Sequence, residues 1–114
     1  MSGPSANPLR WVLPALIIGA TGCGPVQSTA LLIDTETMLG AAKTAQADKL
    51  APYEWTAANL YLAKSKEEVG YSDFEQAVDY AKKAVDFATR ARDTALKVGK
   101  RNESISSEPP VPAQ

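Results

Sequence analysis

The feature that most constrains this chain is a run of small residues spaced alternately four and three positions apart. The run comprises Ala77, Ala81, Ala84, Ala88, Ala91, Ala95 and Val98. Residues at this spacing lie along one side of an α-helix, and small side chains there let a second helix approach closely. Charged residues recur on the opposite side of the same stretch. The pattern therefore predicts one long amphipathic helix from about Asp73 to Lys100.

Two shorter helices are predicted before this long one. The first begins near Ser28, a suitable N-cap, and runs to residues 47–48. Residues 49–51 form the connection, because Pro52 favours an extended residue before it and suits the first turn of a helix. The second helix runs from Pro52 to about Val69. Its apolar residues lie on two faces, which fits a middle position between two neighbouring helices.

The second and third helices are joined by a short turn. Gly70 is predicted to end the second helix with a left-handed backbone. Ser72 and Glu75 have the spacing of a capping box, in which each side chain accepts a hydrogen bond from the other residue's backbone N–H. So short a turn makes the two helices an antiparallel hairpin. The fold class is therefore all-α, an antiparallel three-helix bundle over residues 28–101 with a long C-terminal helix.

The last segment, residues 102–114, is rich in proline and serine and has little apolar content. Such a composition cannot bury enough apolar surface to offset the entropy of ordering the chain. We therefore predict a disordered tail.

The overall composition excludes several classes of function. The 114 residues include 12 basic and 13 acidic side chains, one cysteine and no histidine. A nucleic-acid-binding domain needs a basic surface, which this balance does not provide. One cysteine without histidine cannot build an ordinary zinc or iron site, and it cannot form a disulfide within one chain. We expect neither a metal nor a cofactor other than a covalent lipid.

The N-terminal 22 residues have the pattern of an export signal. A polar start with a single positive charge, Arg10, precedes an apolar segment over residues 11–20. Ten residues of helix span only about 15 Å, roughly half the hydrocarbon core of a bilayer. A short apolar segment followed by small residues is typical of a signal peptide. The alternative, a buried N-terminal helix, is disfavoured by Pro14 and by the pair Gly19 and Gly22.

The four residues Ala20-Thr21-Gly22-Cys23 resemble the lipobox of bacterial lipoproteins. The resemblance implies cleavage between Gly22 and Cys23, a lipid carrying fatty acyl chains such as palmitate on Cys23, and a short lipidated tether over residues 23–27. Two or three acyl chains anchor a protein to a membrane almost permanently. In such lipoproteins an Asp after the cysteine is the usual signal for retention in the inner membrane. Gly24 stands there instead, which implies the periplasmic face of the outer membrane.

The motifs Pro52-Tyr53-Glu54 and Tyr71-Ser72-Asp73-Phe74 lie within residues 51–95, among many alanines. This stretch resembles short bacterial envelope lipoproteins of the domain-of-unknown-function 4398 family. Members of that family often occur with an OmpA-like peptidoglycan-binding domain. This chain has no room for one, so the resemblance implies that wall binding would come through a protein partner of that kind. The family carries no established activity.

The same stretch also looks like a single tetratricopeptide hairpin, with Ala77, Ala81 and Ala84 on its second helix. The hairpin occurs once, and no proline follows the second helix directly. A concave peptide-binding groove needs about three repeats. A peptide-binding or chaperone-type function is therefore the alternative to a structural or adaptor function.

The carboxylates are the only candidates for acid–base chemistry. Glu67 and Glu68 lie near a helix end, and three aspartates repeat every seven residues: Asp79, Asp86 and Asp93. A catalytic pair needs burial or a shared pocket to separate its pKa values, whereas a solvated helix face with alternating charges is the simpler interpretation. Ser104 and its neighbours in the tail have no base near them in the sequence. We expect no catalytic residues and no enzyme.

Two surfaces are candidates for binding a protein. The aromatic residues Tyr53, Trp55 and Tyr61 form either a binding face or part of the helix packing. The long helix should also extend beyond the second helix, because about 28 residues reach roughly 42 Å and about 18 residues reach roughly 27 Å. The last part of the alanine run would then be covered by the first helix, by a partner helix or by a second copy of the chain. The residues of this predicted partner seam are Ala88, Ala91, Ala95 and Val98.

Overall fold

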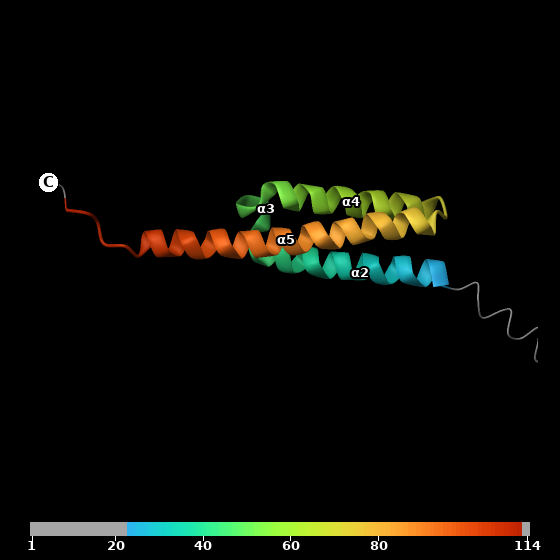
Figure 1. The fold of residues 1–114 in the computed structure, drawn as a ribbon, viewed down its shortest axis with the longest axis horizontal. Coiled ribbons are helices and arrows are strands. Elements are labelled where there is room, and N and C mark those ends of the chain that lie inside the picture. The colour runs from blue at the N-terminus through green and yellow to red at the C-terminus, as the bar shows by residue number, and fades with distance from the viewer. Residues whose placement is uncertain (1–22, 113–114) are drawn as a thin grey trace, which may run out of the picture.

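The computed structural model describes residues 23–112, and these fold into a bundle of helices (Figure 1). The helices are α2 (Cys23–Thr44), α3 (Ala47–Leu50), α4 (Pro52–Gly70) and α5 (Phe74–Ser106). No strand occurs in the described part of the chain. The predicted all-α fold with a long C-terminal helix is therefore confirmed. None of the helices in residues 23–112 is both long enough and apolar enough to cross a bilayer.

α5 is the central helix of the bundle. It packs along both α2 and α4, whereas α2 and α4 touch each other far less (Figure 1). The prediction that the second helix, α4, occupies the middle was wrong. Its second apolar face is turned to solvent, with Tyr53 and Leu60 more than half exposed. The apolar face of α4 could have packed against a second neighbour, but α5 has the run of small residues, from Ala77 to Ala95, that receives two helices.

The core consists mainly of alanine. Every alanine of the predicted seam is buried, and Ala84 and Ala88 contact Leu39, Ala58 and Leu62. The largest side chains that are fully buried are polar: Thr35, Ser28 and Ser65. Buried hydroxyls need hydrogen-bond partners, and Ser65 provides a link between helices because its Oγ donates to the carbonyl of Ala77 on α5 at 2.7 Å.

α2 begins earlier than the sequence predicted. It starts at Cys23 instead of near Ser28, so the predicted tether over residues 23–27 forms the first turn of the helix. Pro25 is tolerated there because the first helical N–H groups have no partner within the helix. Ser28 is not an N-cap. It is buried, and its hydroxyl donates to the carbonyl of Pro25 at 3.0 Å.

The connection between α2 and α4 is longer than predicted. α2 ends at Thr44, and Gln46 takes a left-handed conformation with φ 60°. The single turn α3 then follows before α4 starts at Pro52, as predicted. The buried residues Ala47 and Ala51 lie in this connection and contact Ala91 and Ala95 of α5. The connection is therefore part of the core.

The turn between α4 and α5 uses different residues from those predicted. Gly70 is the last residue of α4 and has no positive φ, and Ser72 takes the left-handed position with φ 62°. The N–H of Asp73 donates to the carbonyl of Glu68 at 2.9 Å, which is the six-to-one bond of a Schellman ending. Asp73 then caps α5 by accepting from the N–H of Gln76 at 3.1 Å. Because the backbone at Ser72 has to reverse, Ser72 cannot also serve as the N-cap.

α5 continues past its predicted end to Ser106, so the first five residues of the predicted tail are helical. No glycine or proline lies between Arg101 and Glu108, and Pro109 is the first residue that stops a helix. With 33 residues, α5 is about 50 Å long, whereas the 19 residues of α4 reach only about 28 Å. α5 therefore projects beyond its neighbours at one end of the bundle (Figure 1).

Candidate functional site

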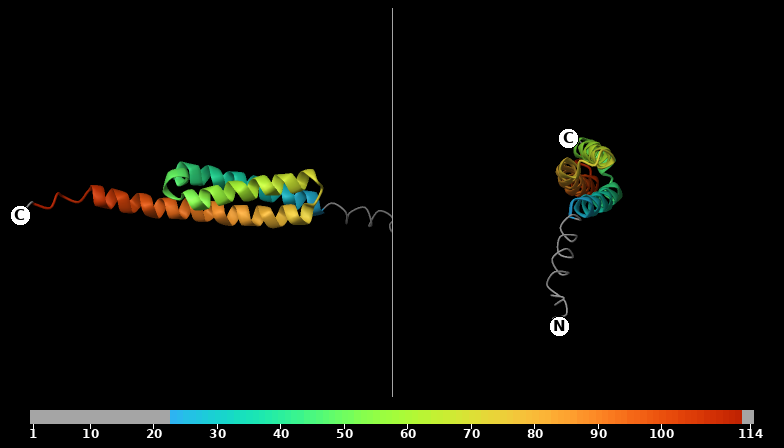
Figure 2. Two further views of the ribbon diagram at one scale, coloured as in Figure 1. Left: turned by 90° about the horizontal axis from the view of Figure 1, so that it is seen from above. Right: turned by 90° about the vertical axis from the view of Figure 1, so that its right-hand side faces the viewer.

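Cys23 is the first residue of α2 and lies at one end of the bundle. The start of α2 lies beside the start of α5, where Gln27 lines a shallow hollow with Phe74 and Val78. The projecting end of α5 lies at the opposite end (Figure 2). The predicted signal peptide, residues 1–22 with Gly22, is outside the described residues. Cleavage before Cys23 and its lipidation stay predictions.

The candidate acid–base residues are spread along the surface. Glu67 pairs with Lys64 at 3.2 Å, and the aspartates at 79, 86 and 93 pair with Lys82, Arg90 and Arg92 respectively. The hydrogen bond to Glu67, together with the charge of that carboxylate, raises the pKa of Lys64 above its usual value. Each of these four carboxylates thus has a basic neighbour on its own helix, whereas Glu68 forms no ion pair within residues 23–112. Within residues 23–112 no group of three acidic or thiol side chains is placed to hold a metal ion.

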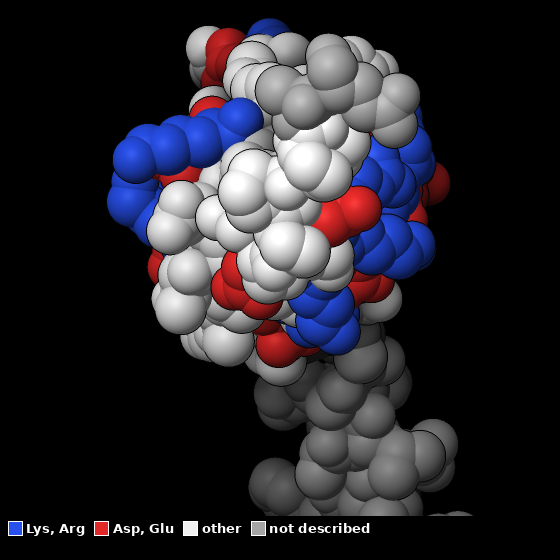
Figure 3. Space-filling view, turned by 90° about the vertical axis from the view of Figure 1, so that its left-hand side faces the viewer, with Lys and Arg blue, Asp and Glu red and all other residues white. Residues whose placement is uncertain are grey.

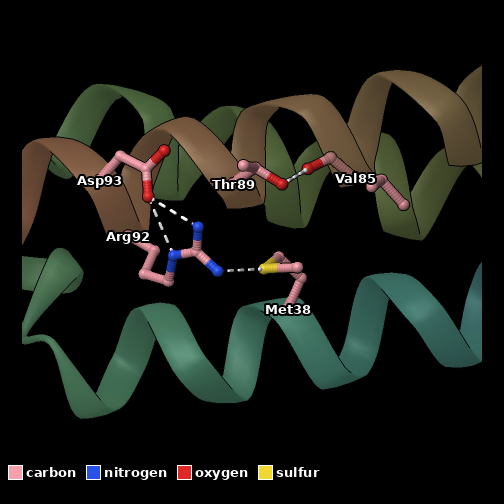
Figure 4. A network of polar contacts seen from close by, with 5 residues as sticks. All are labelled: Met38, Val85, Thr89, Arg92 and Asp93. Carbon is pink, nitrogen blue, oxygen red and sulfur yellow. Dashed lines mark hydrogen bonds and ion pairs between the residues drawn. The ribbon is translucent and has the colours of Figure 1, made fainter.

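Arg92 forms the most extended of the polar contacts between helices (Figure 4). Its guanidinium donates from Nε and Nη2 to Asp93 Oδ1 at 2.9 and 2.8 Å, and Nη1 lies 3.4 Å from Met38 Sδ on α2. Met38 in turn packs against the core. The network thus joins α2 to α5 at a partly exposed position.

The three aromatic residues proposed as a binding face do not act together. Trp55 packs against both core clusters, with Lys43 Nζ 5.6 Å from its ring centre. Tyr61 is half-buried and Tyr53 is 70% exposed. Trp55 is therefore part of the helix packing, and a binding function of Tyr53 stays a prediction.

An aromatic groove runs along the outer side of the α4–α5 hairpin. Phe87 on α5 stacks on Tyr61 at a centroid distance of 5.6 Å and meets Tyr53 edge-on at 6.2 Å. The open groove beside these rings has a volume of about 540 Å³ and is lined by Pro52, Tyr53, Thr56, Ala57, Leu60, Tyr61 and Phe87. Two cations flank it, because Arg90 lies over Phe87 and Lys83 lies over Tyr61. The sequence did not indicate that Phe87 and Leu60 line a groove. The helical spacing of both residues also fits a face that packs against another helix.

The predicted partner seam is not available to a partner. Ala88, Ala91 and Ala95 are buried within the chain, and Val98 is partly covered. Ala91 and Ala95 contact Ala42, Ala47 and Ala51, which come from α2 and the α2–α4 connection. These residues are covered because the first helix and its turn reach further along α5 than α4 does. The residues that remain uncovered lie beyond this seam, from Lys100 to the end of α5.

Residues 30–104 match the family model of a domain of unknown function, DUF4398. The match covers about two thirds of the chain and includes α4 and most of α2 and α5. The chain belongs to the DUF4398 family. The matched region reaches Ser104, so most of the projecting part of α5 belongs to the DUF4398 domain. No curated protein and no solved structure matches the chain.

Proposed function

We propose that this DUF4398 protein is a lipoprotein of the outer membrane, held at the periplasmic face by a lipid on Cys23, and that it serves as a structural or adaptor module of an envelope complex. The observation that carries the proposal is the polarity of the bundle. α2 starts at Cys23 at one end, and α5 projects from the other. A chain anchored at Cys23 would present the projecting end away from the membrane.

Residues 23–27 form the first turn of α2 instead of a tether, and this makes the proposal more specific. Because Cys23 is already helical, a lipid on its sulfur would hold the bundle directly against the bilayer. α5 would then reach about 50 Å outward if it stood along the membrane normal. Each acyl chain contributes about 0.8 kcal/mol per buried methylene, so several chains keep such a rod in place. A rigid rod of this length is suited to hold a partner protein. As that partner we propose an OmpA-like peptidoglycan-binding protein.

The anchor is tested by replacing the single cysteine. Cys23→Ala should abolish metabolic labelling by a fatty-acid probe and shift the protein out of the outer-membrane fraction. The matched control is Cys23→Ala combined with Ser107→Cys, which keeps one exposed cysteine in the chain but moves it to the tail. This double variant should also remain unlabelled. Outer-membrane fractionation of Cys23→Ala that equals the parent's would contradict the proposal.

A peptide-binding function is the second candidate, and it is supported by the exposed aromatic groove of the α4–α5 hairpin. The two candidates place the partner on different surfaces. A photocrosslinking residue introduced at Leu60 reports on the groove, and one introduced at Ile105 reports on the projecting end. Crosslinks to one partner only from position 105 support the adaptor, whereas crosslinks only from position 60 support the peptide binder.

A further inference from the structure

The outer side of α2 carries no charged residue, unlike the outer sides of α4 and α5. It consists of exposed positions that lie opposite the buried side of the helix: Val26, Thr29, Ala30, Ile33, Thr37, Gly40, Ala41 and Thr44. Val26 and Ile33 are 70% and 59% exposed. In contrast, the outer side of α4 includes Lys64, and the outer side of α5 includes Lys82 and Asp86. A helix side that faces water is normally polar and charged, so this side of α2 is atypical for a helix in water.

The threonines on this outer side have hydrogen-bond partners within α2 itself. Thr29 Oγ1 donates to the carbonyl of Pro25 at 2.8 Å, and Thr37 Oγ1 donates to the carbonyl of Ile33 at 2.9 Å. Thr44 makes the same kind of bond four residues back, at 3.1 Å. A hydroxyl that donates within its own helix keeps that hydrogen bond when water leaves its surroundings. The polar residues of this side are therefore compatible with an apolar neighbour.

At the start of α2 the region without charge extends around the whole helix. No charged residue occurs within residues 23–33, and Asp34 is the first. A shallow hollow of about 430 Å³ lies on this segment, lined by Pro25, Val26, Thr29, Ala30 and Ile33. A surface that binds a protein usually has a polar rim on both sides. A bilayer, in contrast, disfavours charge on every side of a segment that enters it. The distribution of charge therefore indicates lipid as the occupant.

The position of Cys23 in the helix places the proposed anchor on the same side. Cys23 precedes Val26 by three positions and Ile33 by ten, and residues at this spacing share one side of a helix. Ile33 lies about 15 Å along the axis from Cys23. The apolar side of an interfacial helix enters the bilayer by only about 5–10 Å. Ile33 therefore reaches lipid only if the bundle leans toward its α2 side.

The charges elsewhere on the bundle agree with this direction. The turn between α4 and α5 lies at the same end as the start of α2, and Asp73 and Glu75 are exposed there. Moving an ionised carboxylate out of water is costly, so this turn has to stay hydrated. A lean toward α2 keeps α4 and α5 on the side away from the bilayer. The far end, where Lys100 and Glu103 are exposed, shows side chains of both charges and would stay in water (Figure 3).

We propose that the start of α2 lies in the interfacial region of the bilayer, with Val26, Ala30 and Ile33 in contact with lipid, and that the bundle leans toward its α2 side. This rests on the proposed lipid anchor and deepens it, because it adds a second membrane contact and a direction of tilt. α5 then reaches outward by less than its full length of about 50 Å. Residues 23–33 contain no basic residue, so the contact needs no anionic lipid and is insensitive to salt.

The test uses the single cysteine of the chain. A lipid on Cys23 would block its sulfur, so that an introduced cysteine becomes the one free thiol. Ile33→Cys on α2 and Leu60→Cys on α4 replace residues that are 59% and 58% exposed. Each full chain is labelled with a fluorophore and reconstituted into phosphatidylcholine vesicles that contain a lipid with a spin label close to its headgroup. Quenching at position 33 should exceed quenching at position 60 at least about threefold, at low and at high salt.

A pair of double variants tests the side chains themselves, with the fluorophore on Ala30→Cys. Val26→Asn with Ile33→Asn should lower quenching at position 30 at least about threefold, because the apolar contact is lost. Tyr53→Asn with Leu60→Asn changes two exposed apolar residues of α4 and should leave it unchanged. Circular dichroism checks that both variants keep the helical fold.

Three results would overturn the proposal. The first is equal quenching at positions 33 and 60, and the second is quenching at position 30 that survives the change of Val26 and Ile33. The third is a fluorophore at position 33 that is shielded from water but not quenched by the lipid, together with disulfide crosslinks between copies of Ile33→Cys. That result would identify a second copy of the chain as the occupant.

The same reagent distinguishes a failure of this proposal from a failure of the anchor. The parent chain is treated with the thiol-reactive fluorophore in urea and detergent. A labelled parent would have a free thiol at Cys23, which would contradict the lipid anchor and the membrane contact that rests on it. An unlabelled parent combined with equal quenching at positions 33 and 60 would retain the anchor and overturn only the contact of α2.

Discussion

The two parts of α5 share one helix and one spacing but have opposite surroundings. Between Ala77 and Ala95 each residue of the seam is buried by α2, α3 or α4. Beyond Gly99 the same spacing passes through Asn102 and Ile105, and both are exposed. The difference follows from the lengths of the neighbouring helices. The spacing of small residues therefore indicates which side of a helix can pack. The lengths of the neighbouring helices determine how far along that side the packing extends.

The two parts also differ in composition. The covered part uses alanine at nearly every seam position, which draws the helices close together. The projecting part places a polar residue, Asn102, and the large residue Ile105 at the corresponding positions, and it carries Lys100 and Arg101 on other sides. The covered part thus packs within the chain, and the projecting part is exposed to solvent.

The largest expected difference between the two parts concerns a buried charge. Ala88→Asp places a carboxylate in the fully buried centre of the seam and should lower the free energy of unfolding by about 4 kcal/mol, a large share of what a domain of this size has. Asn102→Asp makes a similar side chain 14 positions further along the same face. It should change stability by less than about 0.5 kcal/mol, because the site is exposed. Urea unfolding followed by circular dichroism measures both.

Equal destabilisation by the two substitutions would contradict the comparison. It would mean that Asn102 is covered in the protein in solution, either by a second copy or by the tail. Sedimentation of the parent chain would separate these two explanations.

The parts of the fold that were predictable from the sequence are those that one helix determines by itself. The seam from Ala77 to Ala95 and the start of α4 at Pro52 follow from spacing and from the geometry of proline. The left-handed residue Ser72 could not be predicted in this way, because the angle at which α5 returns along α4 decides which residue reverses the backbone. The sequence offered Gly70 as the natural candidate, and it lies two residues too early.

The candidate surfaces were less predictable than the fold. Tyr53 and Leu60 lie on an apolar face of α4, and only the choice of α5 as the central helix exposes them. The groove between α3 and α5 is lined by Leu50 and Gly99, which are 49 positions apart in the chain. Helix spacing carries no information about such a pair. The difference in length between α4 and α5 was predicted from the sequence. It indicated which end of the bundle projects, but not which residues remain uncovered there.

A smaller difference is expected when an apolar side chain is shortened in each part. Leu62 lies in the core, and Leu62→Ala should cost about 2–4 kcal/mol of unfolding free energy through lost burial and the cavity left behind. Ile105→Ala removes a similar volume from the projecting part and should cost less than about 0.5 kcal/mol. Thermal unfolding of the two variants under identical conditions provides the measurement. A loss above about 1 kcal/mol for Ile105→Ala would show that the residue is packed in solution.

The smallest difference concerns two serine hydroxyls that donate to helix carbonyls in different ways. Ser65 Oγ reaches the carbonyl of Ala77 on another helix at 2.7 Å and is buried, whereas Ser104 Oγ reaches the carbonyl of Lys100 in its own helix at 2.9 Å and is exposed. Ser65→Ala should lower the unfolding free energy by about 1 kcal/mol because a bond between α4 and α5 is lost. Ser104→Ala should be neutral or slightly stabilising, since alanine is the better helix former and water replaces the lost contact. If urea unfolding showed Ser104→Ala to be the more damaging substitution, the projecting part would have tertiary contacts of its own, and the distinction between a covered and an uncovered part of α5 would no longer hold.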